Sequence, residues 1–243
     1  MIMQQWIRIA HRGASGLAPE NTLAAFRKAL EIGVDGVELD VHGTADGEVV
    51  VMHDSTLDRT TNLVSTIKTL TLNEIKQGDA GSWFSNEFSG ERVPALVEAL
   101  ELIKKRAITV LEIKDKTIAP AVVSAIHRTQ ATDNVIVISF HPSVLLEFKS
   151  IDPRIPIGFL IGGEAEEPAG QYAIDCVHRT SEIGASTLNV SHNLVTAEFA
   201  DQVRRRGVNL WAWTVDDIHR MRELVALGVQ GITSNYPDRF SHI

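Results

Sequence analysis

Cysteine is almost absent from this sequence, which holds a single one, Cys176. One cysteine cannot form an intrachain disulfide, and it cannot supply the cysteine pair of a zinc finger. Cys176 follows Ala173, Ile174 and Asp175 in a run of helical character, so we expect it to be a small buried side chain rather than a catalytic one. The sequence therefore predicts neither a disulfide framework nor a zinc finger.

An excess of positive charge is also missing. The 23 lysines and arginines are outnumbered by 31 aspartates and glutamates, which gives a formal net charge of −8. Proteins that bind nucleic acids generally need a basic surface to neutralise phosphates. We therefore expect no nucleic-acid partner. An anionic small-molecule substrate is still compatible with this charge, because a bound metal ion reverses the sign of the local field.

Long hydrophobic runs are the third absence. The first residues, MIMQQWIRIAHRG, lack the basic segment and the apolar stretch of a signal peptide, and no run approaches the length of a membrane span. We expect no stable membrane insertion and a cytoplasmic location. Apolar residues nevertheless make up 44% of the chain, which is enough for a full core and excludes a disordered protein.

What the sequence does contain is a regular alternation of strand-like and helix-like segments. The expected strands are Ile7–Ala10, the stretch 36–54, Ile108–Ile113, Val135–Phe140, Ile155–Ile161, Ser186–Val190, Val208–Val215 and Gly231–Ser234. Helical crossovers between strands predict a parallel sheet. Eight such units in 243 residues match a (β/α)₈ TIM barrel, so we expect an α/β fold in a single domain over residues 1–243. A doubly wound open sheet is the alternative, and the lack of a GxGxxG motif after the first strand weakens it.

A long segment of mixed character, about 55–90, follows the second expected strand. Segments of this length without regular structure are usually functional in a compact domain. We expect a small insertion that covers one end of the fold. Trp83, Phe84 and Phe88 need somewhere to pack, which argues against a loose surface loop.

The stretch 36–54, GVELDVHGTADGEVVVMHD, carries the strongest chemical signal. The segment Val37–Val41 alternates with period two, which places Glu38 and Asp40 together on the face opposite the apolar side chains. Two adjacent carboxylates on an inner face are unfavourable without a positive partner. A divalent metal such as Mg²⁺ or Ca²⁺, which takes oxygen ligands, is one such partner. A second apolar run then leads to His53, which could transfer protons.

Charged residues gather at the ends of the first three expected strands, where a TIM barrel has its active site. They are His11, Arg12, Glu38, Asp40, His53, Glu112 and Lys114. Charged groups are rarely buried without partners, so this concentration on one rim predicts a functional site. The three carboxylates indicate an oxygen-ligated metal site with positions open to substrate. A network of salt bridges to the lysine and the arginine is the alternative.

The other residue types on this rim suit a phosphate ester. Arg12 offers a planar fork of donors and Lys114 a point charge. His11 and His53 could act as general base and general acid, since an unperturbed histidine titrates near neutral pH. Trp213, near the end of the seventh strand, is expected to line a substrate pocket, and packing in the barrel core is the alternative.

Several short segments carry a resemblance to a known family. They are AHRGASGLAPENT, GVELDV, HDSTLDRTTN, DAGSWF, LEIK, WAWTV and GITSNYPD, in this order. Together they make the chain resemble the glycerophosphodiester phosphodiesterase family from about Ile9 to Asp238. The combination of HRG…PENT with ELD…HD is its specific part. The family fold is a TIM barrel with a segment inserted after the second strand, which agrees with the strand pattern.

The resemblance implies hydrolysis of glycerophosphodiesters, such as glycerophosphocholine or glycerophosphoethanolamine, to glycerol 3-phosphate and an alcohol. By motif, it makes His11 and His53 the general acid/base pair, Glu38, Asp40 and Glu112 the ligands of Mg²⁺ or Ca²⁺, and Arg12 and Lys114 neighbours of the phosphate. It also suggests that the glycerol 2-hydroxyl attacks first, which gives a cyclic glycerol phosphate that water then opens. One departure is Gly43, which stands where the family commonly has a larger apolar residue.

Two other functions compete with this one. A related barrel could act on a phospholipid that bears choline or inositol, but the sequence shows no basic amphipathic helix for membrane contact. A binding or regulatory barrel could hold a phosphoester without hydrolysing it, and the presence of both His11 and His53 argues against that. Release of glycerol 3-phosphate separates all three functions.

Overall fold

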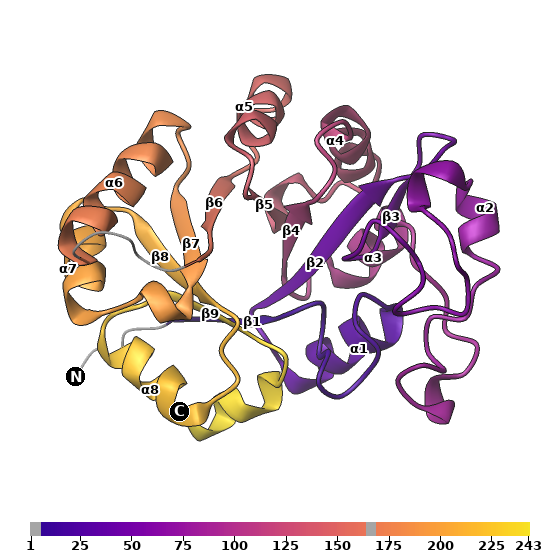
Figure 1. Ribbon diagram of the computed structural model, residues 1–243, viewed down its shortest axis with the longest axis horizontal. Helices are drawn as coiled ribbons and strands as arrows, with labels where there is room; N and C mark the ends of the chain where they lie inside the picture. The colour runs from indigo at the N-terminus through magenta and orange to yellow at the C-terminus, as the bar shows by residue number, and fades with distance from the viewer. Residues whose placement is uncertain (1–5, 164–168) are drawn as a thin grey trace.

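The computed structural model describes residues 6–163 and 169–243, and within them parallel strands close into a barrel. The barrel strands are β1 (Ile7–Ala10), β2 (Gly36–Gly43), β4 (Ile108–Ile113), β5 (Val135–Ser139), β6 (Ile157–Ile161), β7 (Thr187–Ser191), β8 (Asn209–Trp213) and β9 (Gly231–Ser234). Each pairs with the next in parallel, β1 pairs with β9, and the pairing of β1 with β2 completes the ring (Figure 1). The predicted (β/α)₈ TIM barrel is confirmed.

The stretch 36–54 forms a hairpin of two strands. Its second apolar run is β3 (Val49–Val51), which pairs antiparallel with the end of β2, Val41 opposite Val51. Between them Gly47 has a φ of 81°, a left-handed conformation that favours glycine in a reversing turn. The hairpin returns the chain to the rim, so His53 emerges near the carboxylates of β2.

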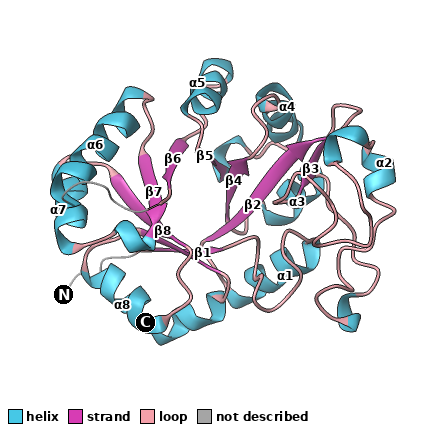
Figure 2. Cartoon of the chain, in the orientation of Figure 1, coloured by secondary structure: helices cyan, strands magenta, loops and turns pink. Residues whose placement is uncertain are grey.

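Helices form the outer ring around the strands (Figure 2). They are α1 (Leu23–Ile32), α3 (Leu96–Ile103), α4 (Ala119–Arg128), α5 (Pro142–Ile151), α6 (Ala169–Glu182), α7 (Ala197–Arg205) and α8 (Ile218–Ala226), with short 3₁₀ helices η3 (Thr132–Asn134), η4 (His192–Leu194) and η5 (Pro237–His242). The boundaries of α1 follow its sequence signals: Thr22 accepts a hydrogen bond from the Ala25 amide, and Gly33 ends the helix at a φ of 83°. None of the helices in the described ranges combines the length and apolar character needed to cross a bilayer.

The predicted insertion lies between β3 and α3 and contains η1 (Ile67–Thr69), α2 (Leu72–Ile75) and η2 (Asn86–Phe88). A second small core joins it to the hairpin strand β3, and its members are Val50, Met52, Leu57, Ile67, Ile75, Ala80 and Val93. Figure 1 shows α2 at the side of the barrel, next to β3. Of its three aromatic residues, Phe84 lies edge to face with both Trp83 and Phe88, and Trp83 stays 41% exposed.

The alternation of side chains along the strands separates two environments. Residues such as Val37 and Leu39 join the large core between strands and helices. A smaller cluster fills the inside of the barrel: Ile9, Val110, Ile136, Ile138, Leu160 and Trp211. Glu38 and Asp40 have the opposite parity to Val37 and Leu39, so β2 directs them to the inside of the barrel. Apolar side chains thus fill the inside of the barrel, and the charged side chains lie above them at the carboxyl ends of the strands.

Candidate active site

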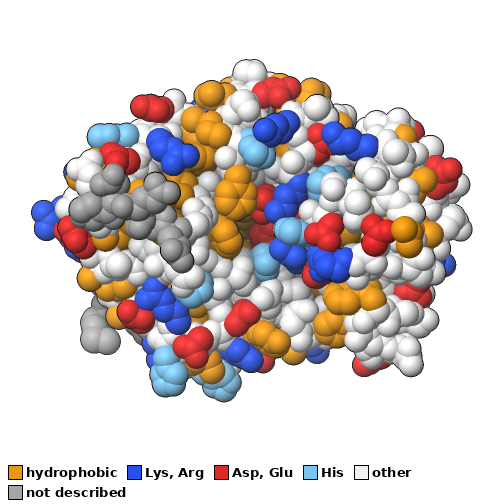
Figure 3. Space-filling view, in the orientation of Figure 1, with side chains coloured by type: hydrophobic (Ala, Val, Ile, Leu, Met, Phe, Trp, Pro, Cys, Tyr) orange, Lys and Arg blue, Asp and Glu red, His pale blue; other side chains and the backbone are white. Residues whose placement is uncertain are grey.

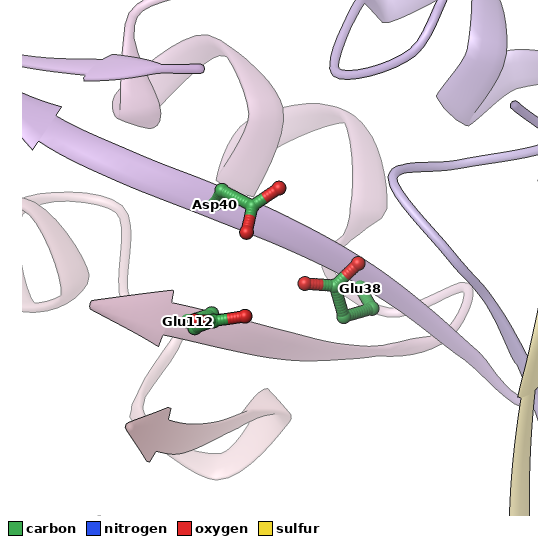
Figure 4. Close-up of side chains that lie close together, drawn as sticks. All are labelled: Glu38, Asp40 and Glu112. Carbon is green, nitrogen blue, oxygen red and sulfur yellow. The ribbon is translucent and has the colours of Figure 1, made fainter. Parts of the chain in front are cut away.

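The carboxylates predicted to converge do so. Asp40 on β2 lies opposite Glu112 on β4 in the strand register, and Glu38 is two residues before Asp40. Carboxylate oxygens of all three lie within 4.8 Å of one another, and the side chains are at least 90% shielded from solvent. Figure 4 shows the three groups directed toward a shared space between the two strands.

Two cations contact the carboxylate cluster. The Lys114 ammonium is 3.2 Å from Asp40 Oδ1 and 2.6 Å from Glu112 Oε1. The Arg12 Nε is 3.3 Å from Asp40 Oδ2, and the Arg12 amide donates a hydrogen bond to Glu38 Oε2 at 2.8 Å. Arg12 adopts a φ of 53°, which is uncommon for a residue with a side chain and brings its amide to the carboxylate. The salt-bridge alternative is thus part of the same site, with three acidic groups facing two basic ones.

The directions of the pKa shifts indicate that Lys114 and Arg12 do not neutralise all three carboxylates. Burial raises the pKa of Glu38 well above its usual value, and the neighbouring Asp40 and Glu112 carboxylates add to the shift. Burial also raises the pKa of Glu112 to about 7. Burial alone would raise the pKa of Asp40, but Lys114 and Arg12 hold it at about 2. Asp40 Oδ1 and Glu112 Oε1 also have no aligned hydrogen-bond donor. The donor set therefore fits a divalent cation, which would replace the protons.

The stabilisation that a metal ion gives the folded protein should increase with pH. In the metal-free protein, Glu112 keeps a proton up to its pKa of about 7 that the unfolded chain has already lost, so the free energy of unfolding falls as the pH rises from about 6.5 to about 8. The raised pKa of Glu38 acts in the same direction. The pKa of His11, lowered by burial to about 4, gives the opposite slope only below its unfolded value of about 6.5. We therefore expect Mg²⁺ or Ca²⁺ to raise the melting temperature more at the higher pH.

Melting curves by circular dichroism, with and without metal at the two pH values, measure this effect. Glu112→Gln is the matched control, because it keeps the volume of the side chain and removes the titrating proton. Its metal-free melting temperature should depend less on pH. A metal-induced shift that is equal at both pH values would contradict the prediction.

Both predicted histidines lie beside the carboxylate cluster, and each is oriented by a partner. His11 follows β1, and its Nδ1 lies 2.7 Å from Asn235 Oδ1, whose own amide nitrogen donates to Asp216. This arrangement protonates His11 at Nδ1 and leaves Nε2 free, 3.9 Å from Glu38 Oε2. Burial lowers the pKa of His11 to about 4, so its imidazole is neutral at pH 7.

His53 has a carboxylate as its partner. Its Nδ1 lies 2.6 Å from Asp54 Oδ1, within the hairpin end that follows β3. A carboxylate on Nδ1 selects the tautomer in which Nε2 has no proton and can accept one. Both histidines line the same cavity, so two groups able to exchange protons face the same space.

The cavity at the carboxyl ends of the strands has a volume of about 250 Å³. Its lining residues are His11, Arg12, Glu38, His53, Glu112, Lys114, Ile138, Phe140, Leu160, Asn189, Trp213, Thr214 and Thr233. Figure 3 shows charged and histidine side chains on one side of the central hollow and hydrophobic ones on the other. Trp213 lies in the wall as predicted, edge to face with Phe140 at 5.6 Å between ring centroids. Trp211 belongs to the barrel core.

Sequence reasoning did not assign the residues that hold the site residues in place. Asn21 donates to Asp40 Oδ2 at 2.9 Å and accepts from the Asp40 amide. Asn235 orients His11, although the two are 224 positions apart in the sequence. Their positions inside the PENT and SNYPD segments are the signal that could have identified them. The departure at Gly43 also has a steric reason, since a Cβ atom there would lie 2.6 Å from a methyl carbon of Ile118.

Comparison with known proteins gives matches over nearly the whole chain. The model of the Glycerophosphoryl diester phosphodiesterase family matches residues 11–239. A glycerophosphodiester phosphodiesterase of Caldanaerobacter subterraneus subsp. tengcongensis is 39% identical over 236 residues, 95% of this chain and 94% of the relative. A solved structure of a phosphodiesterase from Oleispira antarctica, in complex with the product sn-glycerol-3-phosphate, has a TM-score of 0.88 at 29% identity. The match covers 96% of this chain and 94% of the Oleispira chain. The glycerophosphodiester phosphodiesterase of Thermotoga maritima gives 0.78 at 28% identity, covering 97% of each chain.

Proposed function

The chain belongs to the glycerophosphoryl diester phosphodiesterase family and is a glycerophosphodiester phosphodiesterase, and we propose that it uses a divalent metal ion and two histidines to hydrolyse small, water-soluble glycerophosphodiesters. Glycerophosphocholine and glycerophosphoethanolamine are the proposed substrates, and the products are glycerol 3-phosphate and an alcohol. The observation that carries this proposal is the buried cluster of Glu38, Asp40 and Glu112 beside two histidines in one cavity.

The charged side of the cavity suits the phosphodiester. Glu38, Asp40 and Glu112 would hold the ion, either Mg²⁺ or Ca²⁺, since all three offer carboxylate oxygens. Such an ion supplies Lewis acidity, which stabilises negative charge on the phosphoryl oxygens. Arg12 and Lys114 also line the cavity and would contact the phosphate, one through directed hydrogen bonds and the other through charge.

The histidines supply proton transfer on the two sides of the phosphorus. His11 is neutral at pH 7, so we assign it the first transfer, in which Nε2 takes the proton of the glycerol 2-hydroxyl. The 2-oxygen forms a bond to phosphorus while the bond to the leaving alcohol breaks. For this step His53 must carry a proton on each ring nitrogen, and its Nε2 gives one to that alcohol while Nδ1–H stays bonded to Asp54. Water then attacks the cyclic glycerol phosphate with the roles of the histidines exchanged, and the bond from the 2-oxygen to phosphorus breaks.

The apolar side of the cavity suits the carbon atoms of the substrate. Phe140 and Trp213 form a continuous wall, and Phe140 is 39% exposed. We propose that Trp213 packs against the substrate and that the leaving alcohol lies toward solvent. This placement lets one glycerol-binding site accept different head groups.

Release of glycerol 3-phosphate from glycerophosphocholine, followed with a coupled dehydrogenase, tests the function. We expect turnover in the presence of Mg²⁺ or Ca²⁺, and its complete absence with either substrate would reject the proposal. An analogue with hydrogen in place of the 2-hydroxyl tests the first step. We expect hydrolysis of the analogue to fall by several orders of magnitude, because it loses an intramolecular nucleophile whose effective molarity can reach ~10⁵ M or more. Hydrolysis at close to the normal rate would instead indicate direct attack by water.

A further inference from the structure

One arginine of the insertion bridges two carboxylates at the edge of the site. Arg59 donates from Nε to Asp54 Oδ2 at 2.7 Å and from Nη2 to Asp54 Oδ1 at 3.2 Å. It also donates from Nη1 to Glu20 Oε2 at 2.9 Å and from Nη2 to Glu20 Oε1 at 2.8 Å. A planar guanidinium is therefore engaged by two carboxylates in a paired geometry on two of its edges.

Each of these carboxylates is bonded to a residue that lines the cavity. Asp54 Oδ1 accepts from His53 Nδ1 at 2.6 Å. Glu20 Oε1 accepts from Arg12 Nη1 at 2.9 Å. Hydrogen-bond donors and acceptors thus alternate from His53 to Arg12, and Arg59 is the central member. The two ends are the proposed proton donor and a proposed phosphate contact.

We propose that Arg59 is a positioning residue that fixes His53 through Asp54 and Arg12 through Glu20. This inference rests on the function proposed above, because it assigns Arg59 a role in that reaction. Arg59 touches neither the metal ligands nor, in this structure, the cavity. It acts by holding two carboxylates whose orientation decides which nitrogen of His53 carries a proton and where the Arg12 fork points.

The backbone around Arg59 is anchored, as a positioning residue requires. Thr60 and Thr61, which follow it, are both buried. The Thr61 hydroxyl donates to the carbonyl of Leu57 at 2.8 Å, and the Thr60 hydroxyl contacts the sulfur of Met52 at 3.2 Å. Leu57 and Met52 belong to the core of the insertion. The insertion therefore supplies a fixed point from which Arg59 reaches the rim.

A fully exposed ion pair would contribute little to the orientation of its side chains, because solvent screens the charges. Arg59 has a half-exposed side chain, but its partner Glu20 is only 13% exposed in its side chain. Burial would raise the pKa of Glu20, and Arg59 and Arg12 together lower it, so Glu20 stays charged between them. The pKa of Asp54 is likewise lowered, first by its hydrogen bonds to Arg59. Both carboxylates are thus held as acceptors for the cavity residues.

Steady-state kinetics of single variants separate the connection through Asp54 to His53 from the connection through Glu20 to Arg12. Arg59→Ala should lower kcat ~10–100-fold, the usual loss when an orienting partner is removed, and should raise KM several-fold. Asp54→Asn should reproduce the kcat loss, and Glu20→Gln should reproduce the KM increase. When Arg59→Ala is added to Asp54→Asn, kcat should show little further loss while KM still rises. Arg59→Lys should be intermediate, because one ammonium cannot pair with both carboxylates as the fork does.

Arg92→Ala is the matched control for the fold of the insertion. Within residues 6–163 and 169–243, Arg92 donates only to the carbonyls of Gln77 and Gly78, at 2.7 and 3.0 Å, and it does not line the cavity. This variant should lower thermal stability about as much as Arg59→Ala and leave kcat and KM unchanged. Equal kinetic losses in the two variants, or multiplicative kcat losses of Arg59→Ala and Asp54→Asn, would overturn the proposal.

A measurement without substrate keeps this test independent of the proposed reaction. Nitrogen-15 spectra of the histidine rings report which ring nitrogen carries the proton. We expect His53 to be the Nδ1–H tautomer in the parent protein and in Arg92→Ala, and a mixture of tautomers in Arg59→Ala. An unchanged His53 spectrum in Arg59→Ala would reject the positioning role. If the tautomer shifts while no glycerophosphodiester is hydrolysed, the proposed function fails and the positioning role stands.

Discussion

Removal of divalent metal ions is expected to abolish hydrolysis, and added Mg²⁺ or Ca²⁺ is expected to restore it. The reason is electrostatic: Glu38, Asp40 and Glu112 place three carboxylates within 4.8 Å of one another, and a phosphodiester brings a further negative charge. Without the ion, the lysine and arginine that contact the cluster must neutralise both the carboxylates and the substrate. Glycerol 3-phosphate release after exhaustive dialysis against a chelator measures the loss, and titration with each metal measures the recovery.

Ligand variants distinguish a missing ion from a damaged protein. Glu112→Gln should require a much higher metal concentration for half-maximal activity, because a neutral amide is a weaker ligand than a carboxylate. Glu101→Gln is the matched control, since Glu101 is an exposed acid on α3 that pairs with Lys104. That variant should have the parent metal requirement. Full turnover in metal-free buffer would exclude the assignment of the carboxylates as metal ligands.

His11→Ala and His53→Ala are each expected to lower kcat by ~10²–10⁴, the usual range for loss of a general acid or base. The reason is that each imidazole faces the cavity with Nε2 free while a partner holds Nδ1. The double variant should lose less than the product of the single losses, because the two groups act in one proton-transfer sequence. Steady-state kinetics at saturating metal give all three values.

The control for the histidine variants is an exposed histidine of similar chemistry. His178 on α6 lies on the protein surface, so His178→Ala should retain the parent kcat. Both active-site variants should keep the parent melting temperature within a few degrees, since His11 and His53 lie in connections after strands. A near-normal kcat for either active-site variant would remove that histidine from the mechanism.

The parts of this molecule that could be predicted from sequence are those with a local pattern. Period-two alternation at Val37–Val41 is enough to place Glu38 and Asp40 on one face of a strand. Apolar runs separated by helical stretches are enough to predict the barrel, because parallel strands need crossovers. The convergence of Glu112 with them also follows, since neighbouring parallel strands end on the same rim.

The parts that could not be predicted depend on contacts between distant segments or on loop conformation. The antiparallel pairing of β3 with β2 is one such contact, because it depends on how long each strand continues beyond the turn between them. The bridging role of Arg59 requires Glu20, 39 positions away, to lie beside Asp54. The partners of Trp83 could not be predicted either, because aromatic residues can pack against one another without being covered by the barrel.

Because the first strand of the barrel pairs with the last, the enzyme can be active only after nearly the whole chain has folded. Strand β1 pairs with β9 from Ile7 opposite Gly231 to Ala10 opposite Ser234, and Asn235 then holds His11. During synthesis, β1 and the carboxylates of β2 leave the ribosome early. His11 gains its partner Asn235 only after almost all of the remaining chain has been made. Loops this long make such contacts slow to form relative to local ones. A nascent or truncated chain that ends before Gly231 would therefore carry the acidic cluster in its sequence and have no oriented base to use with it.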